Sequence, residues 1–229
     1  MSEPEPRRGR AHDAKGAREA ILKAAEAVFA EHGFDGARID AIAKASGYNS
    51  SLLFQYFGDK LGLYAEVLKR ANREIIELRA RMLAPLLEDE TIASNAHRFK
   101  AFLETIVQAL FDFLLEHPRF VRMLLWEMAE GWQTYAKIVP QLNTEDLDRL
   151  ETLFHKVRSA GLLRSDFVPL VQLTMATQIC QSYLAFLPLY QMFLPGEDLS
   201  SAAALARARE YIAAIVVAGM MVDLPETKP

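Results

Sequence analysis

Helical spacing of the apolar residues is the feature that most limits how this 229-residue chain can fold. Ile21, Ala25, Val28 and Phe29 stand at positions i, i+4, i+7 and i+8, which places them on one face of an α-helix. The same spacing continues to about Val222, interrupted by glycine and proline, and no segment alternates apolar and polar residues as a half-buried strand would. The chain is therefore expected to be all-α.

Two short helices joined by a tight turn are predicted near the N-terminus. The first runs over residues 38–45, Gly47 suits the left-handed backbone of a tight turn, and Asn49 can cap a second helix over 50–56. A longer helix over 13–31 precedes them. Two short helices with a glycine-containing turn between them are typical of a helix-turn-helix DNA-binding motif.

The second short helix carries side chains suited to reading DNA. Leu53 and Phe57 are four residues apart and face the core, which leaves the other positions facing outward. Amides and hydroxyls hydrogen-bond to base edges or phosphates, and leucine can touch a thymine methyl group. This helix has no arginine or lysine, so phosphate contacts must come from Lys60, Arg38 and the N-terminal arm. The predicted DNA-contacting residues are Arg38, Asn49, Ser50, Ser51, Leu52, Gln55, Tyr56 and Lys60.

Residues Ala17 to Leu68 closely resemble the N-terminal domain of TetR-type transcription regulators. The matching stretches are AILKAAEAVFAEHGFDG and IDAIAKASGYNSSLLFQYFGDKLGLYAEVL, in the family's order and spacing and without gaps. The resemblance implies a three-helix DNA-binding domain followed by a larger helical ligand-binding and dimerisation bundle. It also implies that Tyr56 and Lys60 grip phosphates, and that the groove-facing positions are Ser50, Ser51, Leu52 and Gln55.

Four positions depart from the family's pattern. Asn49 replaces the usual serine cap and can do the same work. Phe54 stands where a tyrosine is usual, so a hydroxyl contact from that position is lost. Ala37 and Arg38 stand where two Ser/Thr residues are usual, which removes a helix cap and a phosphate contact. Arg38 is the candidate to contact phosphate instead.

Four segments are expected along the chain. They are a disordered basic arm over 1–12, a helix-turn-helix domain over 13–60, a connecting helix over 61–84, and a helical regulatory and dimerisation domain over 85–229. The arm contains three arginines and could either reach a DNA groove or remain a solvated tail. Further helices are expected over 94–116, 119–131, 143–160, 166–187 and 200–222, bounded by glycine and proline.

An apolar effector pocket in the C-terminal region is implied by the resemblance. Large aromatic residues at helical spacing are more often core than ligand-binding, and this alternative stays open for each of them. Thr174 and Gln178 lie within an apolar helix and could orient a ligand or bond to nearby backbone. The candidate ligand-binding residues are Phe102, Ile106, Met123, Trp126, Trp132, Tyr135, Thr174, Gln178 and Tyr183.

The final helix has a wide apolar face rich in small residues, which permit close approach of another helix. It could pack only on its own chain, or form a four-helix dimer interface with the 166–187 helix, as the resemblance implies. The second interpretation is favoured because a terminal helix leaves one side free. The candidate interface residues are Leu205, Ala208, Ile212, Ile215, Val216 and Gly219.

Other classes of protein are disfavoured by what the sequence lacks. The single cysteine, Cys180, and five scattered histidines have no metal-ligand spacing, so neither a metal nor a cofactor is expected. No P-loop, Rossmann glycine pattern or G-x-S-x-G elbow occurs, so no enzyme activity is expected. The polar N-terminus does not resemble a signal peptide, and no apolar run reaches the roughly 20 residues that span a bilayer. A soluble, cytoplasmic protein with no membrane partner is expected.

These features together predict a sequence-specific transcription regulator that binds double-stranded DNA. The most favoured form is a homodimeric repressor, released from a palindromic operator by a small, largely apolar effector. Activation instead of repression stays open, and a helical module that binds only protein is the alternative from another class. The net charge of −4 does not itself favour nucleic acid.

Overall fold

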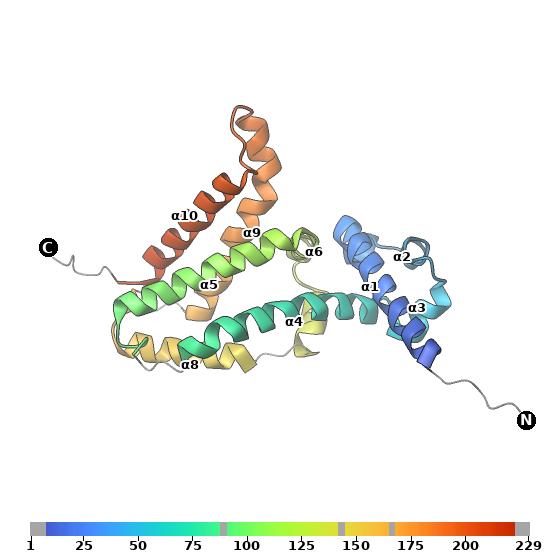
Figure 1. Ribbon diagram of the computed structural model, residues 1–229, viewed down its shortest axis with the longest axis horizontal. Helices are drawn as coiled ribbons and strands as arrows, with labels where there is room; N and C mark the ends of the chain where they lie inside the picture. The colour runs from blue at the N-terminus through green and yellow to red at the C-terminus, as the bar shows by residue number, and fades with distance from the viewer. Residues whose placement is uncertain (1–7, 88–90, 142–144, 165–167, 223–229) are drawn as a thin grey trace, which may run out of the picture. The chain divides into compact units, whose positions relative to one another are not determined.

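The computed structural model describes residues 8–87, 91–141, 145–164 and 168–222, and these are almost entirely helical (Figure 1). The all-α prediction is confirmed, and the β-pairing within these ranges is one isolated bridge between Leu163 and Met221. The helices are α1 (Arg8–Gly36), α2 (Ile39–Ser46), α3 (Ser50–Phe57), α4 (Lys60–Leu87), α5 (Ala96–Glu116), α6 (Pro118–Ala129), α7 (Tyr135–Ile138), the 3-10 turn η1 (Val139–Gln141), α8 (Glu145–Ser159), α9 (Pro169–Phe193) and α10 (Ala202–Met220).

Helix contacts divide the described residues into two compact units. The first unit draws on residues 1–73 and 119–142, and therefore contains α1, α2, α3, the start of α4, α6 and α7. The second draws on 74–118 and 143–229, and contains the rest of α4 with α5, α8, α9 and α10. The sequence had assigned the helix after residue 119 to the regulatory region of 85–229, whereas its contacts place it with the N-terminal helices.

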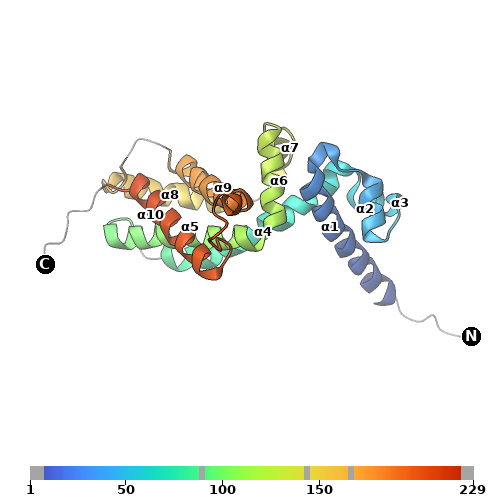
Figure 2. The ribbon, with the colours of Figure 1, turned by 90° about the horizontal axis from the view of Figure 1, so that it is seen from above.

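Large apolar side chains from four helices form the core of the first unit. Ile21 and Phe29 of α1, Ile42 of α2, Leu53 of α3 and Tyr64 of α4 are all almost completely buried. The rings of Phe29 and Tyr64 meet edge to face, with their centroids 4.7 Å apart. Each such burial contributes about 1.5–3 kcal/mol, so these contacts hold the short helices α2 and α3 in fixed positions against α1 (Figure 2).

Helix α1 is longer at both ends than the helix predicted over residues 13–31. The helix begins at Arg8, so residues 8–12 of the expected disordered arm are helical, while residues 1–7 lie outside the described residues. No proline follows Pro6 before residue 85, so nothing in the sequence stops the helix from extending toward the N-terminus. The regular helix breaks at Gly33, two residues beyond the end of the predicted 13–31 helix.

Alanine at position 33 is expected to destabilise the first unit. Gly33 has φ 69° and ψ −177°, a conformation nearly restricted to glycine, and a Cβ atom there would lie 3.0 Å from the Trp126 indole. Backbone strain alone costs about 1–3 kcal/mol. Urea unfolding followed by circular dichroism should therefore show a lower midpoint for Gly33→Ala.

The matched control is Gly16→Ala in the same helix. A Cβ atom at Gly16 meets nothing within 4 Å, and alanine favours a helix over glycine by about 1 kcal/mol. The unfolding midpoint of this variant should stay the same or rise. Equal midpoints for the two variants would contradict the strain assigned to Gly33.

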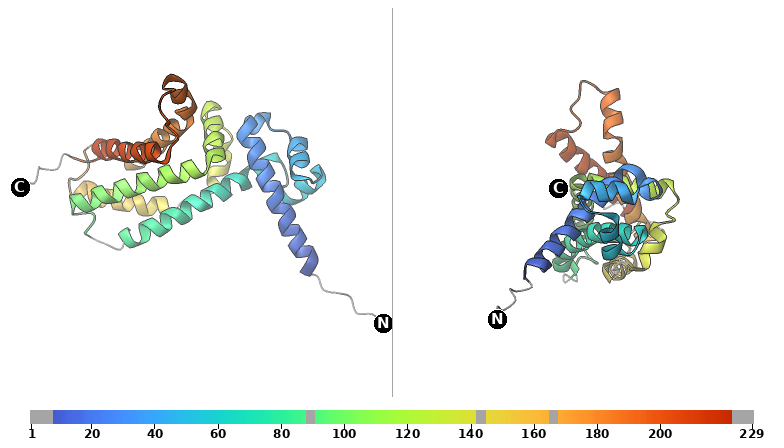
Figure 3. Two further views of the ribbon diagram at one scale, coloured as in Figure 1. Left: turned by 45° about the horizontal axis from the view of Figure 1, so that its top comes forward. Right: turned by 90° about the vertical axis from the view of Figure 1, so that its right-hand side faces the viewer.

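Helix α5 supplies much of the core of the second unit. Phe99, Phe102 and Phe111 on this helix are buried, and Phe99 meets Phe154 of α8 edge to face at 6.0 Å. Helix α10 runs alongside α5 (Figure 3, left). The Arg209 guanidinium of α10 donates two hydrogen bonds, of 2.8 and 3.0 Å, to the Asp112 carboxylate of α5. Apolar packing and this ion pair together fix α10 on its own chain.

Helix α9 corrects one predicted boundary. The sequence placed the end of this helix before Pro188, but α9 continues through Pro188 to Phe193. A proline within a helix removes one backbone hydrogen bond and does not by itself prevent continuation. Beyond the helix, the Gln191 side chain accepts from the Leu199 amide at 3.2 Å and donates to two backbone carbonyls, which stabilises the following loop.

Candidate nucleic-acid interface

The turn between α2 and α3 has the geometry that its sequence predicts. Gly47 adopts φ 78° and its backbone N–H reaches the carbonyls of Ala43 and Lys44 at the end of α2. The Asn49 side-chain oxygen accepts a hydrogen bond of 2.9 Å from the Leu52 amide and so caps α3. The predicted cap is confirmed, and it starts α3 at a defined residue. As expected, Arg38 provides no side-chain cap for α2.

Helix α3 presents an apolar side inward and a mixed side outward. Leu53 and Phe57 are buried, as predicted. Of the predicted groove-facing set, Ser51 and Gln55 are exposed, whereas Ser50 and Leu52 are half-buried. Because α3 is short and packed at only two positions, most of its surface is available to a partner.

Two features of this surface were not predicted. The Ser50 hydroxyl donates a 3.0 Å hydrogen bond to the Asp40 carboxylate of α2, so it is already engaged within the protein. Phe54 is 47% exposed beside Gln55, although it was absent from the predicted contact set. An exposed aromatic ring can make an apolar contact with a thymine methyl group. The sequence did contain a signal: Phe54 lies off the face of the helix that Leu53 and Phe57 share, so its ring was free to be exposed.

Two side chains predicted to contact phosphates, Lys60 and Tyr56, form hydrogen bonds to backbone carbonyls near the two ends of α1. Lys60 donates a 3.1 Å hydrogen bond to the carbonyl of Asp35 and lies 4.8 Å above the Phe34 ring. The Tyr56 hydroxyl donates a longer bond of 3.3 Å to the carbonyl of Ala14. An ammonium group has three N–H donors, so Lys60 keeps donors for a phosphate while it stays anchored. Tyr56 has one O–H donor and must release Ala14 to donate elsewhere.

Two arginines of the first unit form ion pairs within the protein. The Arg18 guanidinium forms an ion pair with Glu66 and lies 5.3 Å from the centre of the Phe57 ring. Arg70 pairs with Glu19 in the same way. Both pairs join α1 to α4, so these arginines position the helices around α3 and are not counted among the DNA contacts.

The nine candidate ligand-binding residues do not fall in one unit. Met123, Trp126, Trp132 and Tyr135 belong to the first unit, with α6 and α7, and the other five belong to the second. Within the second, Phe102 is core, Ile106 and Tyr183 are half-buried, and Thr174 and Gln178 are exposed on α9. The candidates therefore come from both units, because the contacts of α6 and α7 place those helices with the N-terminal helices.

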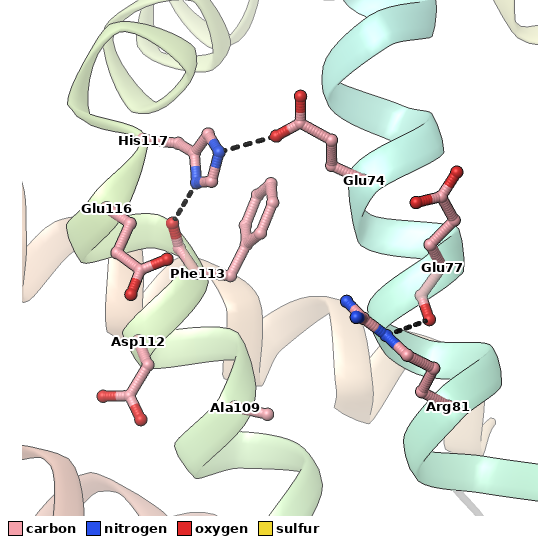
Figure 4. Close-up of a pocket in the computed structure, with 8 residues that line it drawn as sticks. All are labelled: Glu74, Glu77, Arg81, Ala109, Asp112, Phe113, Glu116 and His117. Atoms are coloured by element: carbon pink, nitrogen blue, oxygen red, sulfur yellow. Dashed lines mark hydrogen bonds and ion pairs between the residues drawn. The ribbon is translucent and has the colours of Figure 1, made fainter.

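A charged cavity lies within the second unit instead. It has a volume of about 500 Å³ (Figure 4), and the candidate ligand residues do not line it. His117 is held there, with its ring nitrogens 2.7 Å from the Phe113 carbonyl and 2.7 Å from the Glu74 carboxylate. The Phe113 carbonyl oxygen and the Glu74 carboxylate are both hydrogen-bond acceptors. The lining residues are Glu74, Glu77, Arg81, Ala109, Asp112, Phe113, Glu116 and His117.

The six candidate interface residues divide into three groups by exposure. Ile212 and Val216 are buried within their own chain, and Val216 also lines the groove between α9 and α10. Ile215 and Gly219 are exposed, whereas Leu205 and Ala208 are half-buried. Ile215, Gly219 and α9 residues such as Met175 and Ile179 line an apolar groove of about 360 Å³. Met175, Ile179 and Ile215 are each more than one-third exposed, so an apolar surface runs across α9 and α10.

The structure also describes the single cysteine, the arrangement of metal-ligating side chains and the length and polarity of the helices. Cys180 is completely buried, and burial raises the pKa of its thiol to about 12, so the thiol is protonated at neutral pH. A buried protonated thiol fits a core role. The described ranges contain no cluster of three or more metal-ligating side chains. In the same ranges, every helix is too short or too polar to cross a bilayer.

Comparison with known proteins connects this geometry to one family. Residues 21–67 match the family described as bacterial regulatory proteins, tetR family, and residues 100–216 match the tetracyclin repressor-like C-terminal domain. The transcriptional repressor NicS of Pseudomonas putida is 27% identical over 76% of this chain and 78% of its own length. The transcriptional activator FasR of Mycolicibacterium smegmatis is 32% identical over 62% of this chain and 59% of its own.

Solved structures show the same fold. The putative regulator SCO4942 of Streptomyces coelicolor superposes with a TM-score of 0.60 at 24% identity, covering 89% of this chain and 98% of that one. FadR of Bacillus subtilis, solved in complex with stearoyl-CoA, gives a TM-score of 0.59 at 17% identity, covering 88% and 98%. The two matched regions together account for most of the chain, and its relatives are regulators of transcription. The chain belongs to the TetR family of bacterial regulatory proteins.

Proposed function

We propose that this protein is a homodimeric transcription repressor that reads its operator with α3. The observation that carries the proposal is the outward surface of α3, with Ser51, Phe54 and Gln55 exposed on a helix that Asn49 caps and Leu53 anchors. The major groove of B-DNA accepts one α-helix, and helix-turn-helix proteins place their second short helix there. Lys60, Tyr56 and Arg38 would contact phosphates beside it.

Dimerisation is part of the proposal because of the surface across α9 and α10. Stable monomers rarely expose a continuous apolar surface of this kind without a partner. A second copy, related by a two-fold axis, would bury Met175, Ile179 and Ile215 against the same residues of its partner. Two reading helices related by such an axis require a palindromic operator.

Response to a small molecule is the third element of the proposal. The cavity at Glu74, Asp112 and His117 is the candidate effector site in the second unit. Its charged lining supports an effector with polar groups rather than the largely apolar effector that the sequence suggested. FadR, which has the same fold, was solved in complex with stearoyl-CoA. That complex supports a test of small-molecule binding in this chain.

Activation is the second candidate mode, since FasR is an activator. Repression is favoured because NicS, a repressor, aligns over more of this chain. Transcription in vitro from a promoter that carries the operator distinguishes the two, since the protein should lower the transcript yield if it represses.

Selection of bound sequences from random DNA is the experiment that tests the proposed function. We expect a palindromic motif whose half-sites are centred about one helical turn apart or a multiple of it. Binding to that motif should weaken steeply as salt rises, because phosphate contacts release counterions. Failure to enrich any sequence, at both low and moderate salt, would show that the protein is not a sequence-specific DNA binder.

A further inference from the structure

A buried carboxylate in the first unit has no role in the proposed reading of DNA. Glu127 of α6 is completely buried. One of its oxygens accepts a 2.8 Å hydrogen bond from the Tyr64 hydroxyl of α4, and the other accepts a 2.9 Å bond from the Tyr135 amide of α7. A buried carboxylate is tolerated only when its oxygens have donors. Glu127 therefore joins three helices of this unit.

The carboxylate also organises the segment that follows α6. Thr134 stands at the cap position of α7 but makes no side-chain cap, and Glu127 supplies the missing acceptor for the first amide of that helix. Between the helices, Gly131 and Trp132 adopt φ 71° and 62°, and the Trp132 amide donates a 2.7 Å bond to the Glu127 carbonyl. A tryptophan in the left-handed region is strained and must be held by its surroundings.

Tyr64 connects this carboxylate to the proposed phosphate contact. Its ring is completely buried and packs against Phe29 at 4.7 Å and Phe34 at 5.1 Å. Lys60 lies one turn earlier on α4 and over the same Phe34 ring. Burial and the neighbouring Glu127 raise the pKa of Tyr64 above its ordinary value, so the hydroxyl stays protonated and donates.

The path of the chain makes this connection relevant to regulation. Residues 119–142 belong to the first unit, but the chain on both sides of them belongs to the second. A change in the second unit can therefore reach the first through the two ends of this segment, as well as along α4. The hydrogen bond from the Tyr64 hydroxyl to the Glu127 carboxylate joins this segment to the start of α4, which belongs to the same unit as α2 and α3.

We propose that Glu127 is a positioning residue which, through Tyr64, couples residues 119–141 to the occupancy of the DNA-reading surface. The inference rests on the proposed DNA binding. Coupling between two places is reciprocal, so DNA bound at α3 must affect the 119–141 segment if that segment affects DNA binding. This reciprocity allows a test without the effector, with DNA itself as the probe.

The experiment is amide hydrogen exchange of the full chain, with and without an operator duplex obtained by selection from random DNA. In the wild type, DNA should slow exchange at residues 39–57 and also at 119–141. In Tyr64→Phe, DNA should still slow exchange at 39–57, whereas 119–141 should exchange about tenfold faster and no longer respond to DNA. Tyr211→Phe, which removes the hydroxyl of an exposed tyrosine in the second unit, is the matched control and should behave as the wild type.

Glu127→Gln supplies the conservative rescue. The amide oxygen can accept from the Tyr135 N–H while the amide N–H donates to the Tyr64 oxygen, so the DNA-linked slowing at 119–141 should persist. A wild type in which DNA protects 39–57 but not 119–141 would overturn the proposal, and so would an unchanged DNA response in Tyr64→Phe. A wild type with no protection at 39–57 would instead refute the proposed function itself.

Discussion

Replacing Ile215 by aspartate is expected to convert the dimer to a 25.8 kDa monomer and to reduce operator affinity by at least about 100-fold. Ile215 is 44% exposed on the single chain and lines the apolar groove between α9 and α10. In the proposed dimer its aspartate would be buried without a partner, which costs several kcal/mol or forces the two chains apart. Separated monomers would then lose the gain in effective concentration that two linked reading helices provide.

A nearby isoleucine offers a matched control for this experiment. Ile212 is only 4% exposed and does not line the groove, so Ile212→Asp should unfold the second unit, seen as lost helical circular dichroism. Ile215→Asp should keep the wild-type spectrum, because the substituted side chain reaches solvent in the monomer. Analytical ultracentrifugation at micromolar concentration gives the mass of each variant, and gel shift gives its affinity. A wild type that sediments as a monomer yet binds its operator tightly would refute the dimer.

Substitutions at Gln55 and Lys60 are expected to weaken DNA binding in two different ways. Gln55 is exposed on α3, so Gln55→Ala should change the preferred base at one position of the operator half-site, a contact worth roughly 1–3 kcal/mol. Lys60 is the proposed phosphate contact, so Lys60→Ala should weaken binding to all sequences by a similar factor. Its log–log salt slope should fall by about one.

Selection from random DNA and salt titration of each variant separate these two effects. Both substitutions lie outside the core of the first unit, so the helical content and unfolding midpoint should stay near those of the wild type. A Gln55→Ala motif identical to that of the wild type would remove α3 as the reading helix. An altered motif with an unchanged salt slope in Lys60→Ala would move that residue from the phosphates to the bases.

Local features of the first unit could be predicted because they depend on residues close together in the chain. Gly47 forms the tight turn and Asn49 caps α3, as expected. Leu53 and Phe57 are buried because they are four residues apart on a helix with only one packed side. The break in α1 lies at Gly33, close to the predicted end of that helix at residue 31, and few other residues adopt its backbone conformation.

Contacts across long separations could not be predicted in this way. Met123, Trp126, Trp132 and Tyr135 were grouped with the C-terminal region, because the sequence shows that they are large and apolar but not which helix they meet. Glu127 gave no signal, since an acidic residue in a helix is usually solvated. Its burial depends on Tyr64, which is 63 residues earlier in the chain.

The sequence by itself determined that this chain is helical and where most of its helices begin and end, because helical spacing, caps and turn glycines act over a few residues. It also indicated the family, through the resemblance of residues 17–68 to TetR-type regulators. Only the tertiary structure decided which side of each helix is covered. On α10 the apolar face is continuous in the sequence, yet packing against α5 and α9 leaves Ile212 and Val216 buried and Ile215 exposed. The physical reason is that burial depends on the neighbour that packs against a side chain, and periodicity identifies a face without identifying its neighbour.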